Sequence, residues 1–185
     1  PKDGSALYYG KIFSEEQSDF YYDYLLNHIA WENFEAIYSG KRIIAKREVA
    51  WFGDEEFEIV YSGIKKNVQL WTSELLNLKK RCEEISGETY NSCLLNLYHD
   101  GSEGMAYHSD KIKDINRYKA IASLTFGAER KFLFKHKMTN EKIEIVLENG
   151  GLLVMKGETQ DHWLHRIPPE MKIKTPRINL TFRTV

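Results

Sequence analysis

The sequence has few of the residues that cross-link or interrupt small secreted proteins. It contains only two cysteines, Cys82 and Cys93, and four prolines in 185 residues. Two cysteines can form at most one disulfide, so a disulfide-stapled secreted scaffold is excluded. No apolar run is long enough to span a bilayer, and no signal peptide is visible. We therefore expect an intracellular protein with no membrane segment and with a buried, free thiol at Cys82.

Net charge is also nearly absent. The formal charge is -1, from 26 Lys and Arg against 27 Asp and Glu. Binding to nucleic acid through an overall positive charge is therefore excluded, and only local clusters such as Lys41–Arg42 could serve that purpose. Hydrophobic residues make up 42% of the chain and aromatic residues 13%. At this length, that composition predicts one globular domain with a sizeable core.

The first half of the chain predicts two helices. Ser14 and Gln17 have the spacing of a capping box, and a helix should follow to about Ala30. A second helix is indicated by apolar residues that recur at three- and four-residue steps, and Gly87 suits its end. The residues expected to be buried are Phe20, Tyr21, Tyr24 and Leu25 in the first helix, and Val68, Trp71, Leu75, Leu78, Cys82 and Ile85 in the second.

Extended segments account for most of the remaining chain. Residues 46–63 predict a hairpin that turns near Gly53 and Asp54. From residue 89 onward, short apolar runs alternate with turn residues. Many short strands at this spacing predict a β-sandwich or a jelly roll, braced on the outside of one sheet by the helices. The expected fold class is α+β, with mostly β structure.

The stretch "PRINLTFR", residues 176–183, predicts a strand with an unusual polar face. Side chains alternate along a strand, so one face would carry Ile178, Leu180 and Phe182, and the other Arg177, Asn179, Thr181 and Arg183. A polar face exposed to water is the common explanation. A site for a small dicarboxylate is the alternative, because the planar guanidinium of arginine suits a carboxylate. Asn96 and Tyr98 share a strand face upstream and could hold the same acid.

A candidate metal site begins with His108 and Asp110, which point the same way if "MAYHSD" is a strand. The segment "DHWLHRIPP" offers a third ligand, either His162 or His165. Two histidines and one carboxylate with open coordination positions form the facial triad of non-haem Fe(II) oxygenases, although zinc hydrolases use related ligands. A 2-oxo acid would supply electrons for O2, and Arg177 or Arg183 would pair with its far carboxylate.

Five stretches, in order, resemble the successive motifs of the AlkB family of iron- and 2-oxoglutarate-dependent dioxygenases. They are "NLYHDG", "YHSD", "IASLTFGAERKFLF", "GGLLVMKGETQDHWLH" and "PRINLTFR". Among its relatives, the chain looks most similar to the nucleic-acid repair branch. The resemblance implies a double-stranded β-helix, which is a jelly roll, with N-terminal helices. Within a single domain of residues 1–185, residues 1–88 would supply the helices and a substrate-recognition hairpin, and residues 89–185 the catalytic core.

The resemblance also implies residue roles. Iron would be bound by His108, Asp110 and His165, which leaves His162 as a nearby polar residue. The 2-oxoglutarate site would be lined by Asn96, Tyr98, Arg177, Asn179, Thr181 and Arg183. Arg177 would pair with the distal carboxylate, and Arg183 would lie near the chelating end.

The activity that the resemblance implies is oxidative demethylation of bases such as 1-methyladenine and 3-methylcytosine in DNA or RNA. The reaction would use Fe(II), 2-oxoglutarate and O2, would be assisted by ascorbate, and would release formaldehyde, succinate and CO2. An aromatic side chain would stack on the cationic base; Tyr61 is the first candidate, followed by Phe52 and Trp51. Gly40 and Lys41 would lie in a loop that touches the phosphate backbone.

Two departures from the repair branch bear on the substrate. Duplex specialists in the family carry an apolar wedge in the loop where this chain has Tyr38 and Ser39, so a single strand is the expected substrate. Repair members usually carry an acidic residue soon after the His-x-Asp motif, where this chain has Lys111 and Ile112. Base recognition is therefore expected to differ. We expect the protein to act as a monomer.

Two other functions fit the same residues. A 2-oxoglutarate oxygenase with this site could act on a protein, a lipid or a small molecule instead of a nucleic acid. Alternatively, the chain could be a non-enzymatic β-sandwich interaction module in which His108 and Asp110 lie together by coincidence.

Overall fold

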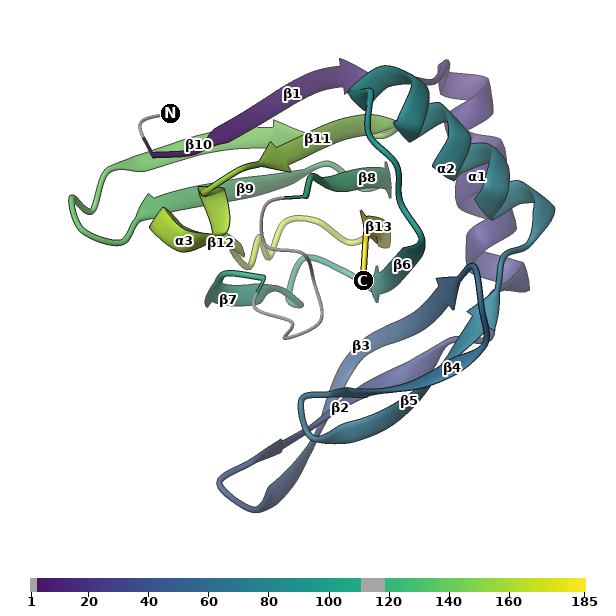
Figure 1. Cartoon of the computed structure of the whole chain (residues 1–185), viewed down its shortest axis with the longest axis horizontal. Helices are drawn as coiled ribbons and strands as arrows, with labels where there is room; N and C mark the ends of the chain where they lie inside the picture. The colour runs from purple at the N-terminus through teal and green to yellow at the C-terminus, as the bar shows by residue number, and fades with distance from the viewer. Residues whose placement is uncertain (1–2, 111–118) are drawn as a thin grey trace.

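Two β-sheets face each other in a computed structural model that describes residues 3–110 and 119–185 (Figure 1). The larger sheet has the strand order β1-β11-β8-β13-β6-β3-β5-β4, with β2 paired to β3, and the smaller sheet has the order β10-β9-β12-β7. The strands of the larger sheet are β1 (Ser5–Lys11), β2 (Glu32–Tyr38), β3 (Lys41–Gly53), β4 (Phe57–Tyr61), β5 (Ile64–Leu70), β6 (Ser92–Tyr98), β8 (Ile121–Gly127), β11 (Gly151–Lys156) and β13 (Arg177–Arg183). Those of the smaller sheet are β7 (Met105–His108), β9 (Arg130–His136), β10 (Lys142–Leu147) and β12 (Trp163–Ile167). The predicted jelly roll is confirmed.

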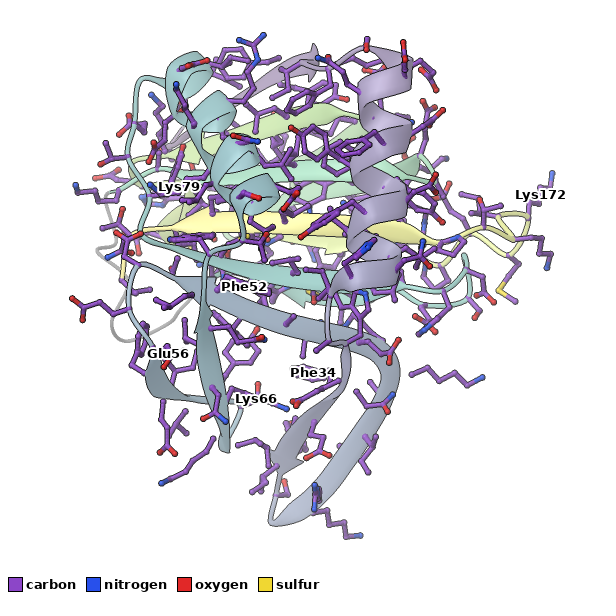
Figure 2. All side chains as sticks on the ribbon, turned by 90° about the vertical axis from the view of Figure 1, so that its right-hand side faces the viewer. Phe34, Phe52, Glu56, Lys66, Lys79 and Lys172 are labelled. Atoms are coloured by element: carbon purple, nitrogen blue, oxygen red, sulfur yellow. The ribbon has the colours of Figure 1, made fainter. Side chains whose placement is uncertain are left out.

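Two helices, α1 (Glu15–His28) and α2 (Ser73–Ser86), cover the outer face of the larger sheet (Figures 1 and 2). Their apolar sides pack on the sheet through Leu25, Leu75, Leu78 and Cys82, all fully buried. The predicted burial of Phe20 is wrong, because this residue lies on the solvent side of α1 and is 58% exposed. No helix among the described residues is both long enough and apolar enough to cross a membrane.

The helix ends follow the predicted capping chemistry. Ser14 and Gln17 form both hydrogen bonds of a capping box. Gly87 ends α2 in the left-handed conformation, with φ 70°, which glycine adopts without steric cost. The start of α2 differs from the prediction, because Thr72 caps the helix and Val68 belongs to β5. A short third helix, α3 (Thr159–His162), precedes β12.

The pairing predicted for residues 46–63 is wrong. These residues form β3 and β4, but β4 pairs with β5, while β3 pairs with β2, with β6 and in parallel with β5. The physical reason is a small apolar cluster, in which Val68 of β5 packs with Trp51 of β3 and Leu94 of β6. Burying Val68 there places β5, not β4, beside β3.

Strands β2 to β5 extend away from the jelly roll, and we call residues 32–70 the arm (Figure 1). The base of the arm is held by the small apolar cluster, against which Phe34, Ile59 and Tyr61 also pack. The tip between β2 and β3 is open to solvent, and Tyr38 there is 73% exposed. The arm therefore combines a packed base with an accessible end.

Strand β13 lies in the middle of the larger sheet, between β6 and β8. Its apolar face packs under the helices through Ile178, Leu180 and Phe182. Its opposite face points between the two sheets, where Arg177, Asn179, Thr181 and Arg183 are each at most 8% exposed. The polar face of this strand is therefore buried, and the interpretation as a water-exposed face is wrong.

Candidate active site

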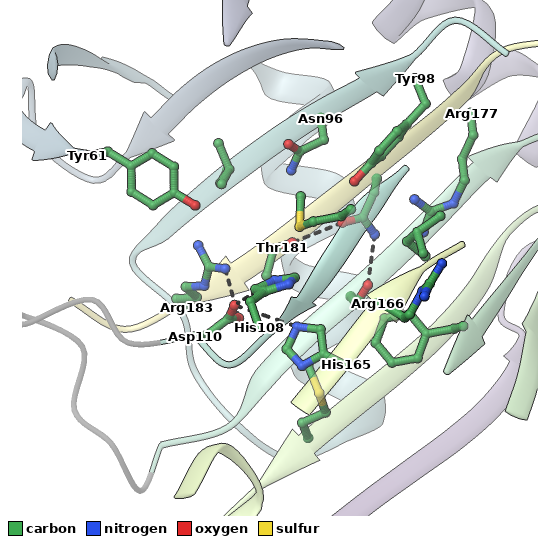
Figure 3. Close-up of a pocket in the computed structure, with 17 residues that line it drawn as sticks. Tyr61, Asn96, Tyr98, His108, Asp110, His165, Arg166, Arg177, Thr181 and Arg183 are labelled. Atoms are coloured by element: carbon green, nitrogen blue, oxygen red, sulfur yellow. Dashed lines mark hydrogen bonds and ion pairs between the residues drawn. The ribbon is translucent and has the colours of Figure 1, made fainter. Parts of the chain in front are cut away.

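A cavity lies between the two sheets (Figure 3). Every residue predicted to bind iron or 2-oxoglutarate lines it: Asn96, Tyr98, His108, Asp110, His165, Arg177, Asn179, Thr181 and Arg183. These residues come from β6, from β7 and the two residues after it, from β12 and from β13. The fold thus brings together side chains that lie far apart along the chain.

The three predicted metal ligands converge at one end of the cavity. His108 ends β7, and His165 lies opposite it in the register of β7 and β12. The Nε2 atoms of both histidines lie 3.7 Å from the same Asp110 oxygen, Oδ1. The ligand atoms of all three residues lie within 4.8 Å of one another, so that one ion could contact all three.

The orientation of these ligands is held by neighbouring groups. His108 Nδ1 lies 2.8 Å from the carbonyl oxygen of Ala106; donating a proton to that carbonyl leaves Nε2 free, as metal-binding histidines require. The backbone N–H of Asp110 donates to the Gln160 side chain at 2.8 Å. The His165 ring stacks on Phe132, with ring centroids 5.3 Å apart.

The surroundings of Asp110 and His165 also set their protonation states. Burial alone would raise the pKa of Asp110, but the charges of Arg183, His165 and His108 outweigh it and lower the pKa to about 2. Arg183 Nη2 donates to Asp110 Oδ2 at 2.9 Å. Burial lowers the pKa of His165 to about 4. Near neutral pH both side chains are therefore deprotonated, which is the form that binds a metal.

The other end of the cavity is cationic. Arg177 is 2% exposed, and its Nη2 donates to Thr125 Oγ1 at 3.0 Å. Among the described residues Arg177 has no carboxylate partner, and its Nε has no hydrogen-bond acceptor. Beside the metal ligands, the Nε and Nη1 of Arg183 have no acceptor either. Burial lowers the pKa of Arg177 to about 10, which still leaves it charged at neutral pH. A buried donor without a partner costs about 1–3 kcal/mol, so these groups suit a bound organic anion.

Two polar residues of this region were missed by the sequence analysis. Ser123 accepts a hydrogen bond from Asn179 Nδ2 at 2.8 Å, and Thr125 accepts the one from Arg177. The signal was present, because Ser123 and Thr125 share one face of the otherwise apolar strand β8. Phe132 also lines the cavity, and its alternation with Phe134 along β9 indicates an inward face.

The predicted substrate residues lie in different places. Tyr61 lines the cavity from the arm, and Trp51 packs behind it with ring centroids 5.3 Å apart. Phe52 is not brought to the site, because it lies on the opposite face of β3, in the core under the helices. Gly40 and Lys41 lie at the exposed tip of the arm. Lys111 and Ile112 are outside the described residues.

A second group of possible metal ligands, Asp3, His136 and His162, does not line the cavity. His136 Nδ1 accepts hydrogen bonds from the backbone N–H groups of Met138 and Thr139, at 3.2 and 3.1 Å. The ring proton is therefore on Nε2, which donates to Asp3 Oδ2 at 3.2 Å. A metal on Nε2 would have to displace that proton, so hydrogen bonding explains this group better.

Two histidines and one carboxylate that converge inside a jelly roll form the facial triad typical of non-haem Fe(II) oxygenases. The model of the 2OG-Fe(II) oxygenase superfamily matches residues 5–183. The chain belongs to this superfamily and, within it, to the AlkB family, as its similarity to individual relatives shows.

The chain is 35% identical over 189 residues to the alpha-ketoglutarate-dependent dioxygenase alkB homolog 3 of Homo sapiens, covering 97% of this chain and 65% of the relative. It is 34% identical over 154 residues to the DNA oxidative demethylase ALKBH2 of Mus musculus, covering 79% of this chain and 64% of the relative. The chain thus spans a little under two thirds of the length of these relatives. The solved structure of OsALKBH1 matches with a TM-score of 0.68 and 15% identity, covering 100% of this chain and 98% of that one, which bears on the fold alone.

Proposed function

We propose that the protein is an Fe(II)- and 2-oxoglutarate-dependent dioxygenase that demethylates N-alkylated bases in nucleic acid. The observation that carries the proposal is the convergence of His108, Asp110 and His165 within 4.8 Å beside the buried Arg177, which has no carboxylate partner among the described residues. Relatives of the chain are named as an alpha-ketoglutarate-dependent dioxygenase and as a DNA oxidative demethylase, which supports the same reaction here.

The protein's part in this reaction is to bind and orient. His108, Asp110 and His165 would hold Fe(II) as a facial triad, which leaves coordination positions open for the acid and for O2. Bound iron, O2 and 2-oxoglutarate supply the oxidation of the N-methyl group, which leaves as formaldehyde, while the acid becomes succinate and CO2. Ascorbate would keep the iron reduced.

The pocket would hold 2-oxoglutarate by its two ends. Arg177 would pair with the distal carboxylate, and the Tyr98 ring, 5.4 Å from the Arg177 guanidinium carbon, would help to position it. Asn96 and Arg183 would face the end that chelates the metal, because Arg183 already contacts Asp110. Asn179 and Thr181 are linked by a 3.0 Å hydrogen bond and would complete the polar wall.

The arm would hold the nucleic acid. Tyr61 would stack on the methylated base, with Trp51 supporting its ring. The base must leave the stack to reach the metal, and the exposed tip at Gly40 and Lys41 would contact phosphate. Where duplex specialists carry an apolar wedge, this tip has Tyr38 and Ser39, which favours a single strand over a duplex that must be wedged open. We also propose a monomer in a reducing, intracellular compartment, where the buried thiols of Cys82 and Cys93 stay free.

The test is to incubate the protein with Fe(II), 2-oxoglutarate and ascorbate, together with single-stranded oligonucleotides that carry 1-methyladenine or 3-methylcytosine. We expect loss of methyl mass, with one formaldehyde and one succinate for each methyl group removed. Turnover of 2-oxoglutarate without any loss of methyl mass would indicate that the substrate is a protein, a lipid or a small molecule. Absence of both turnover and metal binding would indicate that the protein is a non-enzymatic interaction module.

A further inference from the structure

Arg47 connects the arm to the cavity, although no motif in the sequence pointed to it. It lies on β3, half-buried, on the same face as Trp51. Its Nη1 donates a hydrogen bond to the side-chain oxygen of Asn96. Its guanidinium carbon lies 4.2 Å from the centroid of the Phe34 ring and 6.0 Å from that of Tyr98. Arg47 thus contacts both the base of the arm and two residues of the proposed 2-oxoglutarate site.

The hydrogen bond from Arg47 determines which way the Asn96 amide faces. A guanidinium has donors only, so it can bond to the amide oxygen but not to the amide nitrogen. With the oxygen engaged, the two N–H donors of Asn96 remain for another partner, and among the described residues they have none. Because Asn96 lines the cavity, these donors are available to a carboxylate there. In the flipped orientation, the amide oxygen would face that carboxylate and repel it.

The ion pairs of the neighbouring arginines also indicate that Arg47 serves the cavity and does more than stabilise the arm. Within the described part of the chain, Arg47 forms no ion pair with a carboxylate, and neither does Arg177; Arg183 pairs with Asp110. An arginine that only stabilised the arm could pair with an acidic neighbour, as Arg42 does with Glu35 at 2.6 Å. Instead, the Arg47 guanidinium contacts the Phe34 ring and donates to the Asn96 side chain, which lines the cavity.

We infer that Arg47 is a positioning residue for 2-oxoglutarate, and that it acts by holding the Asn96 amide with its N–H donors toward the acid. The inference rests on the proposed function, since it assumes that the acid binds in this cavity. It assigns to the arm a second role, because a residue of a strand proposed to contact the nucleic acid also prepares the site of the co-substrate.

A double-mutant cycle tests this inference. Affinity for 2-oxoglutarate is measured by calorimetry on the full chain under argon with Mn(II), so that no turnover is needed. We expect Arg47→Gln and Asn96→Ala each to weaken binding by about 10-fold, the effect of losing one hydrogen bond of average strength. Because Arg47 acts through Asn96, the double variant should bind no more than about twofold more weakly than Asn96→Ala alone.

The control is Arg81→Gln, which makes the same chemical change at an exposed arginine of α2 that faces Glu84 at 3.7 Å; its affinity should equal that of the wild type. Unchanged affinity in Arg47→Gln, or fully additive effects in the double variant, would overturn the inference. If Arg47→Gln does not fold, the same cycle with Arg47→Met, which has no donor, is judged by the same additivity. Failure of the wild type to bind 2-oxoglutarate would instead refute the proposed function.

Discussion

The inside of the jelly roll and the arm hold their side chains in contrasting ways. Between the sheets, Arg177 and Arg183 are 2% and 5% exposed, and each is positioned by neighbours on adjacent strands or by Asp110. On the arm, Tyr38, Ile44 and Val60 are 73%, 61% and 69% exposed. Beyond its small apolar base, the arm offers side chains that contact little of the protein itself.

This difference matches what each region is proposed to do. Metal and co-substrate chemistry requires groups held in place before the ligands arrive, and burial between two sheets achieves this. A nucleic acid is large and variable in shape, and contacting it requires exposed side chains on an element that projects from the body. The two regions should therefore respond differently to substitution: the inside in turnover and co-substrate binding, the arm in nucleic-acid binding.

The largest effect is expected from the triad. His108→Ala should lower turnover by at least about 100-fold, since loss of a group that merely supports a ligand already costs 10–100-fold. The His108 side chain is 35% exposed, so the melting temperature without metal should hardly change. Asp110→Ala should abolish turnover and also destabilise the protein, because it leaves Arg183 buried without its partner.

Turnover is measured as succinate release, and stability by thermal unfolding. His162→Ala is the matched control, since it removes a histidine three positions from His165 that does not line the cavity; it should retain activity. Substantial activity in both His108→Ala and Asp110→Ala would refute the triad.

The next effect concerns the acid. Arg177→Ala should raise the 2-oxoglutarate concentration needed for half-maximal turnover by about 10–100-fold, the cost of a hydrogen bond to a charged group. Turnover at saturation should change less, because Arg177 lies away from the metal ligands. Steady-state kinetics at varied 2-oxoglutarate measures both values. If this concentration does not change, Arg183 and not Arg177 pairs with the distal carboxylate of 2-oxoglutarate.

A smaller effect is expected on the arm. Lys41→Gln should weaken binding to a single-stranded oligonucleotide and lower the slope of log affinity against log salt by about 0.7, the loss of one phosphate contact. Affinity for 2-oxoglutarate should stay the same. Fluorescence anisotropy at several salt concentrations measures the slope. Lys172→Gln is the control, because Figure 2 shows Lys172 on a loop away from the arm; equal slopes for the two variants would exclude the tip from the binding surface.

The smallest expected effect is on the pH dependence of stability, through His99, which lies where the arm meets the jelly roll. His99 lies 2.9 Å from Glu48 of β3 and 2.9 Å from Glu103. Burial lowers the pKa of His99, but the hydrogen bonds and charges of the two carboxylates outweigh it and raise the pKa above its usual value. Protonated His99 therefore stabilises the folded state. This stabilisation is fully present below the pKa of His99 in the unfolded chain, about 6.5, and it is lost as pH rises through the higher pKa of His99 in the folded protein.

His99→Gln should therefore lower the melting temperature more at about pH 6 than at about pH 9, since the imidazolium form predominates at the lower pH. Thermal unfolding at both pH values measures this difference. Glu103→Gln should reduce the pH dependence, because it removes one of the two carboxylates. A constant gap between wild type and His99→Gln at all pH values would contradict the ion-pair interpretation.

The side chains that face the inside of the jelly roll could be predicted, because the period-two alternation of strands strongly constrains which residues share a face. Residues two apart on a strand face the same way, which placed the polar residues of β13 together. His108 and Asp110 also meet at the metal site, although β7 ends at His108 and Asp110 lies beyond the end of that strand. The arm could not be predicted in the same way. Alternation identifies a strand and its faces, but not its neighbour, and the choice of β5 over β4 beside β3 depends on packing of Val68 against a distant strand.

Single residues of the arm show the same limit. Trp51 and Phe52 are adjacent, both apolar and both buried, so nothing in the sequence indicated which of them packs against Tyr61. Arg47 shares a face with Trp51, but its long side chain reaches Asn96 only because β3 pairs with β6. Contacts that depend on the pairing of distant strands are visible only in the fold.

The central position of β13 has a consequence for how the chain folds. Before residues 177–183 dock, β6 and β8 each present an unpaired row of backbone amides and carbonyls in the middle of the future sheet. Pairing between strands so distant in sequence is slow. The step that pairs β13 with both neighbours also brings in Arg177 and Arg183, so the chain gains two cationic side chains of its cavity when these inner edges of the sheet are closed.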